Sequence, residues 1–217
     1  MNHAAVFHPT ERPWLLIVFG TLGIAGCVAL IAAMIVAPIF VPDHDWISDT
    51  ISDLAAGRWE IIMDVGLYCF ATALIATALA AAHAHLGEGG WTLGIASLAI
   101  LAALVIIIGA RNEYGDKDSE GVVIHIYLVY GLGAFMAVVC ATMQKGLRVA
   151  GHHQAGWFMV LLGLVWVVLA PVFLMSATSI DGLLERALGL VACAVVVTLS
   201  VVFLRRGRLL LREGASP

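Results

Sequence analysis

Six long apolar runs constrain the fold of this 217-residue chain more than any other feature of its sequence. Each run matches or exceeds the roughly 20 residues that a helix needs to cross a lipid bilayer. The runs are Trp14–Val41, Ile61–Ala82, Trp91–Ala110, Val122–Met143, Gly156–Ser176 and Leu183–Leu204. Continuous apolarity without period-two alternation favours helices over a transmembrane β-barrel. We therefore predict an all-α, polytopic membrane protein, a six-transmembrane-helix bundle that forms a single integral-membrane domain over residues 1–217.

The composition excludes several other classes of protein. Hydrophobic residues make up 62% of the chain and charged residues 12%, whereas soluble domains are about 45–50% apolar and about one quarter charged. This rules out a soluble enzyme and a secreted disulfide scaffold. The formal net charge of −4 argues against a polyanionic partner. We expect the lipid bilayer as the surroundings and no nucleic acid as a partner, and nothing in the sequence identifies a cofactor or a metal.

The distribution of Lys and Arg predicts the orientation in the membrane, because cytoplasmic loops carry more of these residues. With the N-terminus in the cytoplasm, four cations fall outside: Arg58, Arg111, Lys117 and Arg186. The larger group falls inside: Arg12, Lys145, Arg148, Arg205, Arg206, Arg208 and Arg212. We therefore predict that the N-terminus and the C-terminus are both cytoplasmic and that the acidic loops face outward.

Small and sulfur-containing residues lie inside the predicted helices. Gly20, Gly23 and Gly26 form a small-residue face on the first helix, which permits close helix packing in lipid. The cysteines fall in the first, second, fourth and sixth spans, at Cys27, Cys69, Cys140 and Cys193. None lies in an outer loop, so we expect free thiols and no disulfide framework.

The segment His44–Leu54 contains Ile-Ser-Asp twice at a spacing of four residues. On a helix this spacing stacks Asp45, Asp49 and Asp53 along one face, opposite an apolar face that includes Ile51. The stacked carboxylates would form a cation site or a network with arginine. The alternative is a solvated acidic face with local caps.

Three further ionisable positions lie near the outer ends of the predicted helices. His125 and Asp64 lie at a comparable depth in the fourth and second spans, where such groups usually face the bundle interior. Glu185 and Arg186 open the sixth span, and because adjacent residues point in different directions we expect separate partners for them. For Arg186 we predict an ion pair with Asp53 in the acidic first loop.

These motifs together resemble the domain-of-unknown-function 998 family of six-helix prokaryotic membrane proteins. The resemblance rests on Thr50–Leu54, on His125 one turn into the fourth span, and on Gly182–Arg186 at the start of the last span. It covers essentially the whole chain in order and spacing, and it implies a location in the inner, or plasma, membrane. The Ile51–Asp53 element is also similar to the first outer loop of Frag1/DRAM/Sfk1 membrane proteins, which are linked to lipid handling.

We hypothesise that the protein is non-enzymatic and that an extracytoplasmic polar cluster stabilises the bundle and binds a lipid headgroup or a partner membrane protein. The cluster comprises Asp49, Ser52, Asp53, Asp64, His125, Glu185 and Arg186. The first alternative is an integral-membrane hydrolase that uses Asp49, Asp53 and His125, since a histidine beside a carboxylate can act as a general base. The second alternative, an ion- or proton-coupled transporter, requires charges near the bilayer midplane, where the spans are nearly bare.

Overall fold

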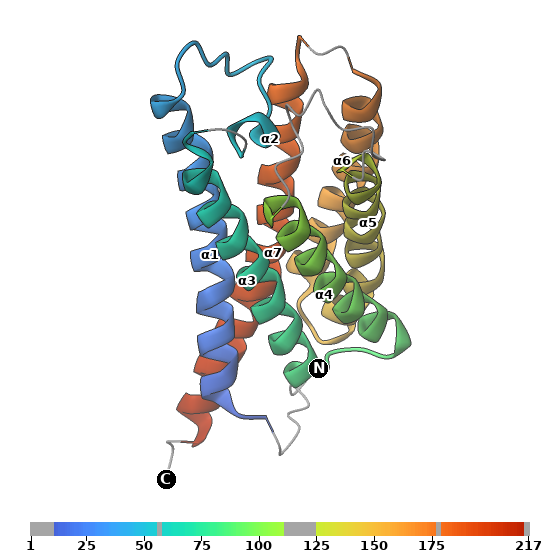
Figure 1. Ribbon diagram of the computed structural model, residues 1–217. Coiled ribbons are helices and arrows are strands. Elements are labelled where there is room, and N and C mark those ends of the chain that lie inside the picture. Colours follow the sequence, from blue (N-terminus) through green and yellow to red (C-terminus); the bar gives the residue numbers. More distant parts are fainter. Residues whose placement is uncertain (1–10, 56–57, 111–124, 177–178, 215–217) are drawn as a thin grey trace.

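The computed structural model describes residues 11–55, 58–110, 125–176 and 179–214. Within these ranges the chain is all-α and six of its helices are long and apolar enough to cross a membrane, as predicted. The helices are α1 (Pro13–Phe40), α2 (Ile51–Leu54), α3 (Glu60–Ala84), α4 (Gly89–Ala110), α5 (His125–Val149), α6 (His153–Met175) and α7 (Asp181–Gly214). The short helix α2 lies in the loop between the first two long helices (Figure 1).

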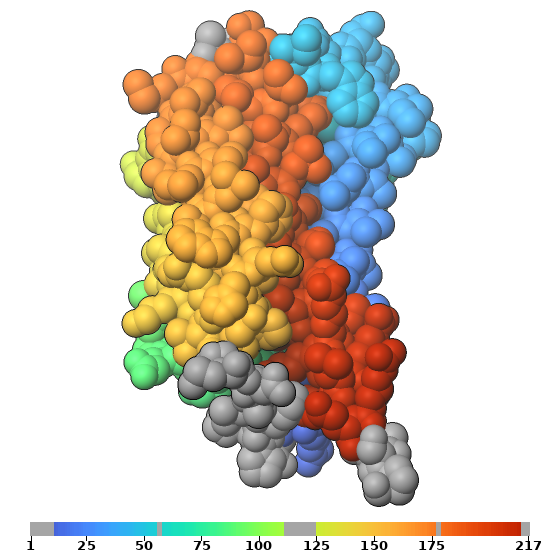
Figure 2. Space-filling view, turned by 180° about the vertical axis from the view of Figure 1, so that it is seen from behind, coloured from blue at the N-terminus to red at the C-terminus, as the bar shows by residue number. Residues whose placement is uncertain are grey.

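The six long helices form a closed ring in which each one packs against two neighbours, in the order α1, α3, α4, α5, α6, α7 and back to α1. The helices α1, α3 and α7 also contact one another and form the most tightly packed part of the ring. Figure 2 shows α6, α7 and α1 side by side on the rear face of the bundle. The start of α1 and the end of α7 lie at the end of the bundle opposite α2 (Figure 1). We call these two ends the Glu11 end and the α2 end.

Close packing of α1 depends on its small-residue face, as the sequence predicts. A Cβ atom added to Gly23 would lie 2.1 Å from the Ser200 Oγ atom of α7. One added to Gly26 would lie 2.2 Å from the main-chain oxygen of Cys69 in α3. Both distances are far below van der Waals contact. The two glycines therefore allow α1 to approach both neighbours at once.

The four cysteines are free in the structure, as predicted. Cys27 and Cys193 face each other across α1 and α7, where each Sγ atom contacts the main-chain oxygen of the other residue, at 3.8 and 4.0 Å. These buried thiols act as small apolar side chains that fill the helix interface.

The last helix is longer than the apolar run predicts, since α7 continues ten residues beyond Leu204 to Gly214. Arg206 in this extension donates from Nε and Nη2 to the two carboxylate oxygens of Glu11, both at 2.8 Å. The side chains are 6% and 3% exposed. A bidentate, buried ion pair of this kind holds the end of α7 against the segment that precedes α1.

Candidate functional site

The Thr50–Leu54 motif folds into the single helical turn of α2, which a capping box stabilises. The Thr50 Oγ1 atom accepts a hydrogen bond from the Asp53 main-chain N–H at 3.1 Å, and the Asp53 carboxylate accepts one from the Thr50 N–H at 2.8 Å. Reciprocal bonds of this kind satisfy donors that have no partner within the helix. Ile51 and Leu54 are buried, so this turn presents an apolar face to the bundle, as predicted.

The predicted stack of three carboxylates on one helix is wrong. Thr50 has an extended backbone, with φ −80° and ψ 166°, and this residue separates α2 from a preceding turn that Asp45 and Asp49 close. In that turn the Asp49 N–H donates to the Asp45 main-chain oxygen at 2.9 Å, and the Asp49 carboxylate accepts from the Asp45 N–H at 2.9 Å. The carboxylates therefore accept hydrogen bonds from nearby main-chain N–H groups and do not form a shared face.

The predicted ion pair between Arg186 and Asp53 is also wrong. The Arg186 Nη1 atom donates to three main-chain oxygens, those of Asp49 at 2.7 Å, Gly182 at 2.9 Å and Trp46 at 3.2 Å. The guanidinium also lies 5.1 Å from the centroid of the Trp46 ring. Arg186 thus contacts the first loop, as expected, but it binds the carbonyl groups of that loop and one aromatic face.

His44 completes the Arg186 environment. The Arg186 Nη2 atom lies 2.9 Å from His44 Nε2, and His44 Nδ1 lies 3.4 Å from the Asp49 carboxylate. Because a guanidinium can only donate, Nε2 must accept, and the imidazole is therefore neutral with its proton on Nδ1. Burial, followed by the Arg186 charge, lowers the pKa of His44, and a hydrogen bond from the Asp45 N–H lowers the pKa of Asp49. His44 is not among the residues of the predicted cluster, and its position in the acidic loop is the signal in the sequence that points to it.

Glu185 binds the next turn of the same loop. Its carboxylate accepts hydrogen bonds from the Ile51 and Ser52 main-chain N–H groups and from the Ser52 hydroxyl at 2.9 Å. These N–H groups belong to the first turn of α2, where a helix has unpaired donors. The adjacent residues Glu185 and Arg186 therefore have separate partners, as predicted.

Gly182 is required for this contact between α7 and the loop. The Gly182 and Leu183 main-chain N–H groups donate to Ser48 and Ile47 oxygens at 3.2 and 3.0 Å. A Cβ atom at Gly182 would lie 2.1 Å from the main-chain oxygen of Asp49. Only glycine permits this approach, which explains its place before Glu185 and Arg186 in the motif.

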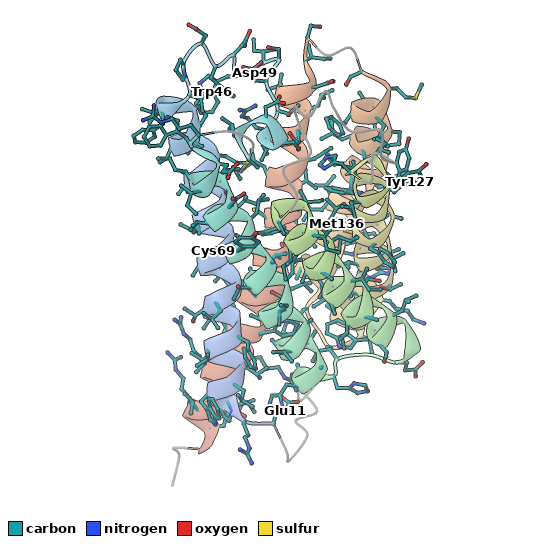
Figure 3. The ribbon with its side chains drawn as sticks, in the orientation of Figure 1. Glu11, Trp46, Asp49, Cys69, Tyr127 and Met136 are labelled. Carbon is teal, nitrogen blue, oxygen red and sulfur yellow. The ribbon has the colours of Figure 1, made fainter. Side chains whose placement is uncertain are left out.

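A cavity of about 410 Å³ opens beneath α2, within the ring of helices. Most of its walls are apolar side chains of α3 to α7, among them Leu74, Leu101, Met136, Trp166 and Ala192. Its polar lining residues are Thr50, Ser52, His125, Ser176, Asp181 and Glu185. All of the polar residues belong to the α2 segment or to helix ends near it. In Figure 3, Trp46 and Asp49 mark the α2 end, Glu11 marks the opposite end, and Met136 lies between the helices below α2.

The predicted cluster thus separates into distinct groups. Ser52, His125 and Glu185 line the same cavity, whereas Arg186 binds the Asp49 main chain outside the cavity lining. Asp53 caps α2. Asp64 is buried in α3 with Oδ1 unpartnered, and it is not among the cavity-lining residues. Within the described part of the chain, no three His, Cys, Asp or Glu residues are grouped to hold a metal ion.

The family of proteins of unknown function DUF998 matches residues 24–202 of the chain. The chain belongs to this family. The match spans all three motifs on which the resemblance rests, and in this DUF998 protein two of those motifs are the two sides of the contact between α2 and α7. Comparisons with curated proteins and with solved structures found no match.

Proposed function

We propose that this DUF998 protein binds a membrane lipid, with the apolar chain of the lipid in the cavity and its polar end beside Ser52, His125 and Glu185. The observation that carries this proposal is the arrangement of the described lining residues: apolar walls give way to polar side chains at the α2 end alone, and we call this polar end the mouth. The volume of about 410 Å³ lies within the range of about 300–1,000 Å³ typical of small-molecule sites.

The proposed place of the site is the outer half of the plasma membrane. The excess of Lys and Arg near the start of α1, the turn between α5 and α6, and the end of α7 supports cytoplasmic termini. Helix α2 lies at the other end of the bundle (Figure 1), and the cavity-lining residues Thr50 and Ser52 belong to its segment. A lipid of the outer leaflet would enter such a site without its polar end crossing the bilayer.

The hydrogen bonds that the Asp49 and Asp53 carboxylates accept agree with a non-enzymatic role. The hydrolase alternative needs Asp49 or Asp53 beside His125, but both carboxylates accept hydrogen bonds within the first loop. The transporter alternative needs charge deep in the bundle. Thr77 and Ser200, 3.1 Å apart, form a neutral polar contact between α3 and α7, and the buried carboxylate of Asp64 lies near the start of α3. These observations favour binding over catalysis or ion transport.

Lipid that copurifies with the protein tests the proposal. Ala192→Phe and, separately, Ala170→Phe place a ring in the cavity. Val168→Phe adds the same ring to α6 at a residue that is 66% exposed, as a matched control. Native mass spectrometry should find bound lipid on the wild type and on Val168→Phe, and little on the two cavity variants. Equal lipid occupancy in all four proteins, or none in the wild type, would refute the proposal.

A further inference from the structure

Each hydroxyl group at the cavity mouth already donates a hydrogen bond within the protein. The Ser52 hydroxyl donates to Glu185, and the Thr50 hydroxyl donates to Asp53 at 2.7 Å. The Ser176 hydroxyl is directed at the Phe173 main-chain oxygen at 2.7 Å and at Asp181. These hydroxyl groups can therefore accept hydrogen bonds from a ligand, but their O–H groups are not free to donate to it.

The carboxylates at the mouth retain acceptor capacity. A carboxylate has about four lone-pair sites. The Glu185 Oε1 atom accepts one hydrogen bond, from Ser52, and Oε2 accepts the two from the main chain. Asp181 accepts from Ser176 through Oδ1. Both carboxylates line the cavity, so the polar end of a ligand that binds here gains most by donating hydrogen bonds.

The arginine next to Glu185 is not among the described cavity-lining residues. Arg186 follows Glu185 in α7, but its Nη1 and Nη2 atoms bind His44 and main-chain oxygens of Trp46, Asp49 and Gly182, and only its buried Nε atom has no partner within the described part of the chain. Among the described residues that line the cavity, none is Lys or Arg. A phosphate group at the mouth would be close to two carboxylates and to the imidazole of His125, with no Lys or Arg among the described lining residues to compensate its charge.

We propose that the mouth formed by Ser52, Asp181 and Glu185 selects a lipid whose polar end carries hydroxyl groups and no phosphate, such as an acylglycerol. This inference rests on the proposed lipid site and specifies its ligand class. The hydroxyls of the ligand would donate to the carboxylates, while its alkyl chain would run along Leu188 and Ala192. From Asp181 to Ala192 the α7 wall rises about 16 Å, which provides a long apolar surface for the chain.

Trp166 provides a reporter inside the cavity. It is 6% exposed, its Nε1 atom donates to the Gly133 main-chain oxygen at 2.9 Å, and it lies about 15 Å from Ser176 along α6. Bromine atoms in the middle of a bound alkyl chain should therefore quench its fluorescence. The part of the quenching that disappears in Trp166→Phe belongs to the cavity, and the rest comes from tryptophans elsewhere.

The test compares two probes that differ by one phosphate: 1-(9,10-dibromostearoyl)glycerol and the corresponding glycerol 3-phosphate ester. For the full-length protein in neutral detergent, the uncharged probe should quench the Trp166 component at about tenfold lower concentration, equivalent to about 1.4 kcal/mol. Asp181→Asn and Glu185→Gln should each reduce this ratio by improving binding of the phosphate probe. A cooperative melting transition above the assay temperature would show that each variant is folded.

The outcomes separate the two proposals. Equal or tighter binding of the phosphate probe would overturn the selectivity and leave the lipid site intact. An unchanged ratio in both carboxylate variants would overturn the role of Asp181 and Glu185. If neither probe quenches the Trp166 component, the lipid site itself is refuted.

Discussion

The Arg186 guanidinium and the main-chain oxygen of Asp49 lie 2.7 Å apart, and this bond joins the start of α7 to the first loop. Together with the bonds from Glu185 to α2, it holds two successive turns of that loop against one turn of a transmembrane helix. Glu185 accepts hydrogen bonds from N–H groups of the loop, and Arg186 donates hydrogen bonds to carbonyl groups of the loop. The adjacent Glu and Arg thus order the mouth of the cavity through the backbone of the loop.

Replacing Arg186 should destabilise the protein more than replacing Asp53. Arg186→Ala removes the side-chain donor to the main-chain oxygens of Trp46, Asp49 and Gly182, and hydrogen bonds to charged groups contribute about 1.5–3 kcal/mol. Asp53→Ala removes part of a helix cap, worth about 1 kcal/mol. Melting temperatures in detergent would measure both effects, with Arg58→Ala as the control for loss of an exposed arginine.

The charge exchange Asp53→Arg with Arg186→Asp should give no recovery relative to Arg186→Ala. An aspartate at position 186 cannot donate to the three carbonyl groups, and an arginine at position 53 cannot cap α2. Recovery of the wild-type melting temperature would instead support a direct ion pair between Arg186 and Asp53, which the structure contradicts.

Adding a methyl group at Gly182 should loosen the contact between α7 and the first loop. In Gly182→Ala the new Cβ atom would meet the Asp49 oxygen at 2.1 Å, so one of the two segments must move. Gly133→Ala is the matched control, because nothing lies within 4 Å of its added Cβ atom. Alanine favours helix over glycine by about 1 kcal/mol. The control should therefore match or exceed wild-type stability, while Gly182→Ala falls below it; equal melting temperatures for the two variants would contradict the close approach.

Stability should fall as the pH drops below about 6.5, in part because of His44. Its pKa is lowered in the folded protein from a usual value of 6.5, so the unfolded chain takes up a proton first and acid favours unfolding. Protonation would also remove the Nε2 acceptor of Arg186. His44→Gln should therefore make the melting temperature less dependent on pH between 7.5 and 5. His152 also has a lowered pKa, which is why the difference between variant and wild type is the quantity to measure. Parallel pH profiles would exclude a role for His44.

The orientation can be tested by cysteine labelling. The background is a variant in which Ser or Ala replaces Cys27, Cys69, Cys140 and Cys193. It should express nearly as well as wild type, because none of the four forms a disulfide. One cysteine is then introduced at a time. An impermeant maleimide should label Ile47→Cys on intact cells and Gln154→Cys only after lysis. Both positions are exposed and lie in the first loop and near the start of α6, respectively. The reverse pattern would place the cavity mouth in the cytoplasm.

The sequence by itself determined the architecture. Runs of about 20 apolar residues have few stable alternatives to helices in lipid, because every backbone donor and acceptor must be paired within the segment. The glycine face of α1 and the free thiols follow from the same local pattern. The four-residue spacing of Ile-Ser-Asp also predicted a helical element in this loop, and its second half is the turn of α2, which Thr50 and Asp53 cap.

The tertiary structure alone decided what the charged residues bind. Opposite charges on the same side of the membrane suggested a pair between Arg186 and Asp53, but main-chain oxygens are the same at every residue and leave no mark in the sequence. Arg186 reaches the Asp49 oxygen because Gly182 lets two backbones touch. The cavity likewise depends on how the ring of helices closes around a space that no single helix defines. Local patterns specify helices and caps, whereas partners and cavities arise from contacts between segments far apart in the chain.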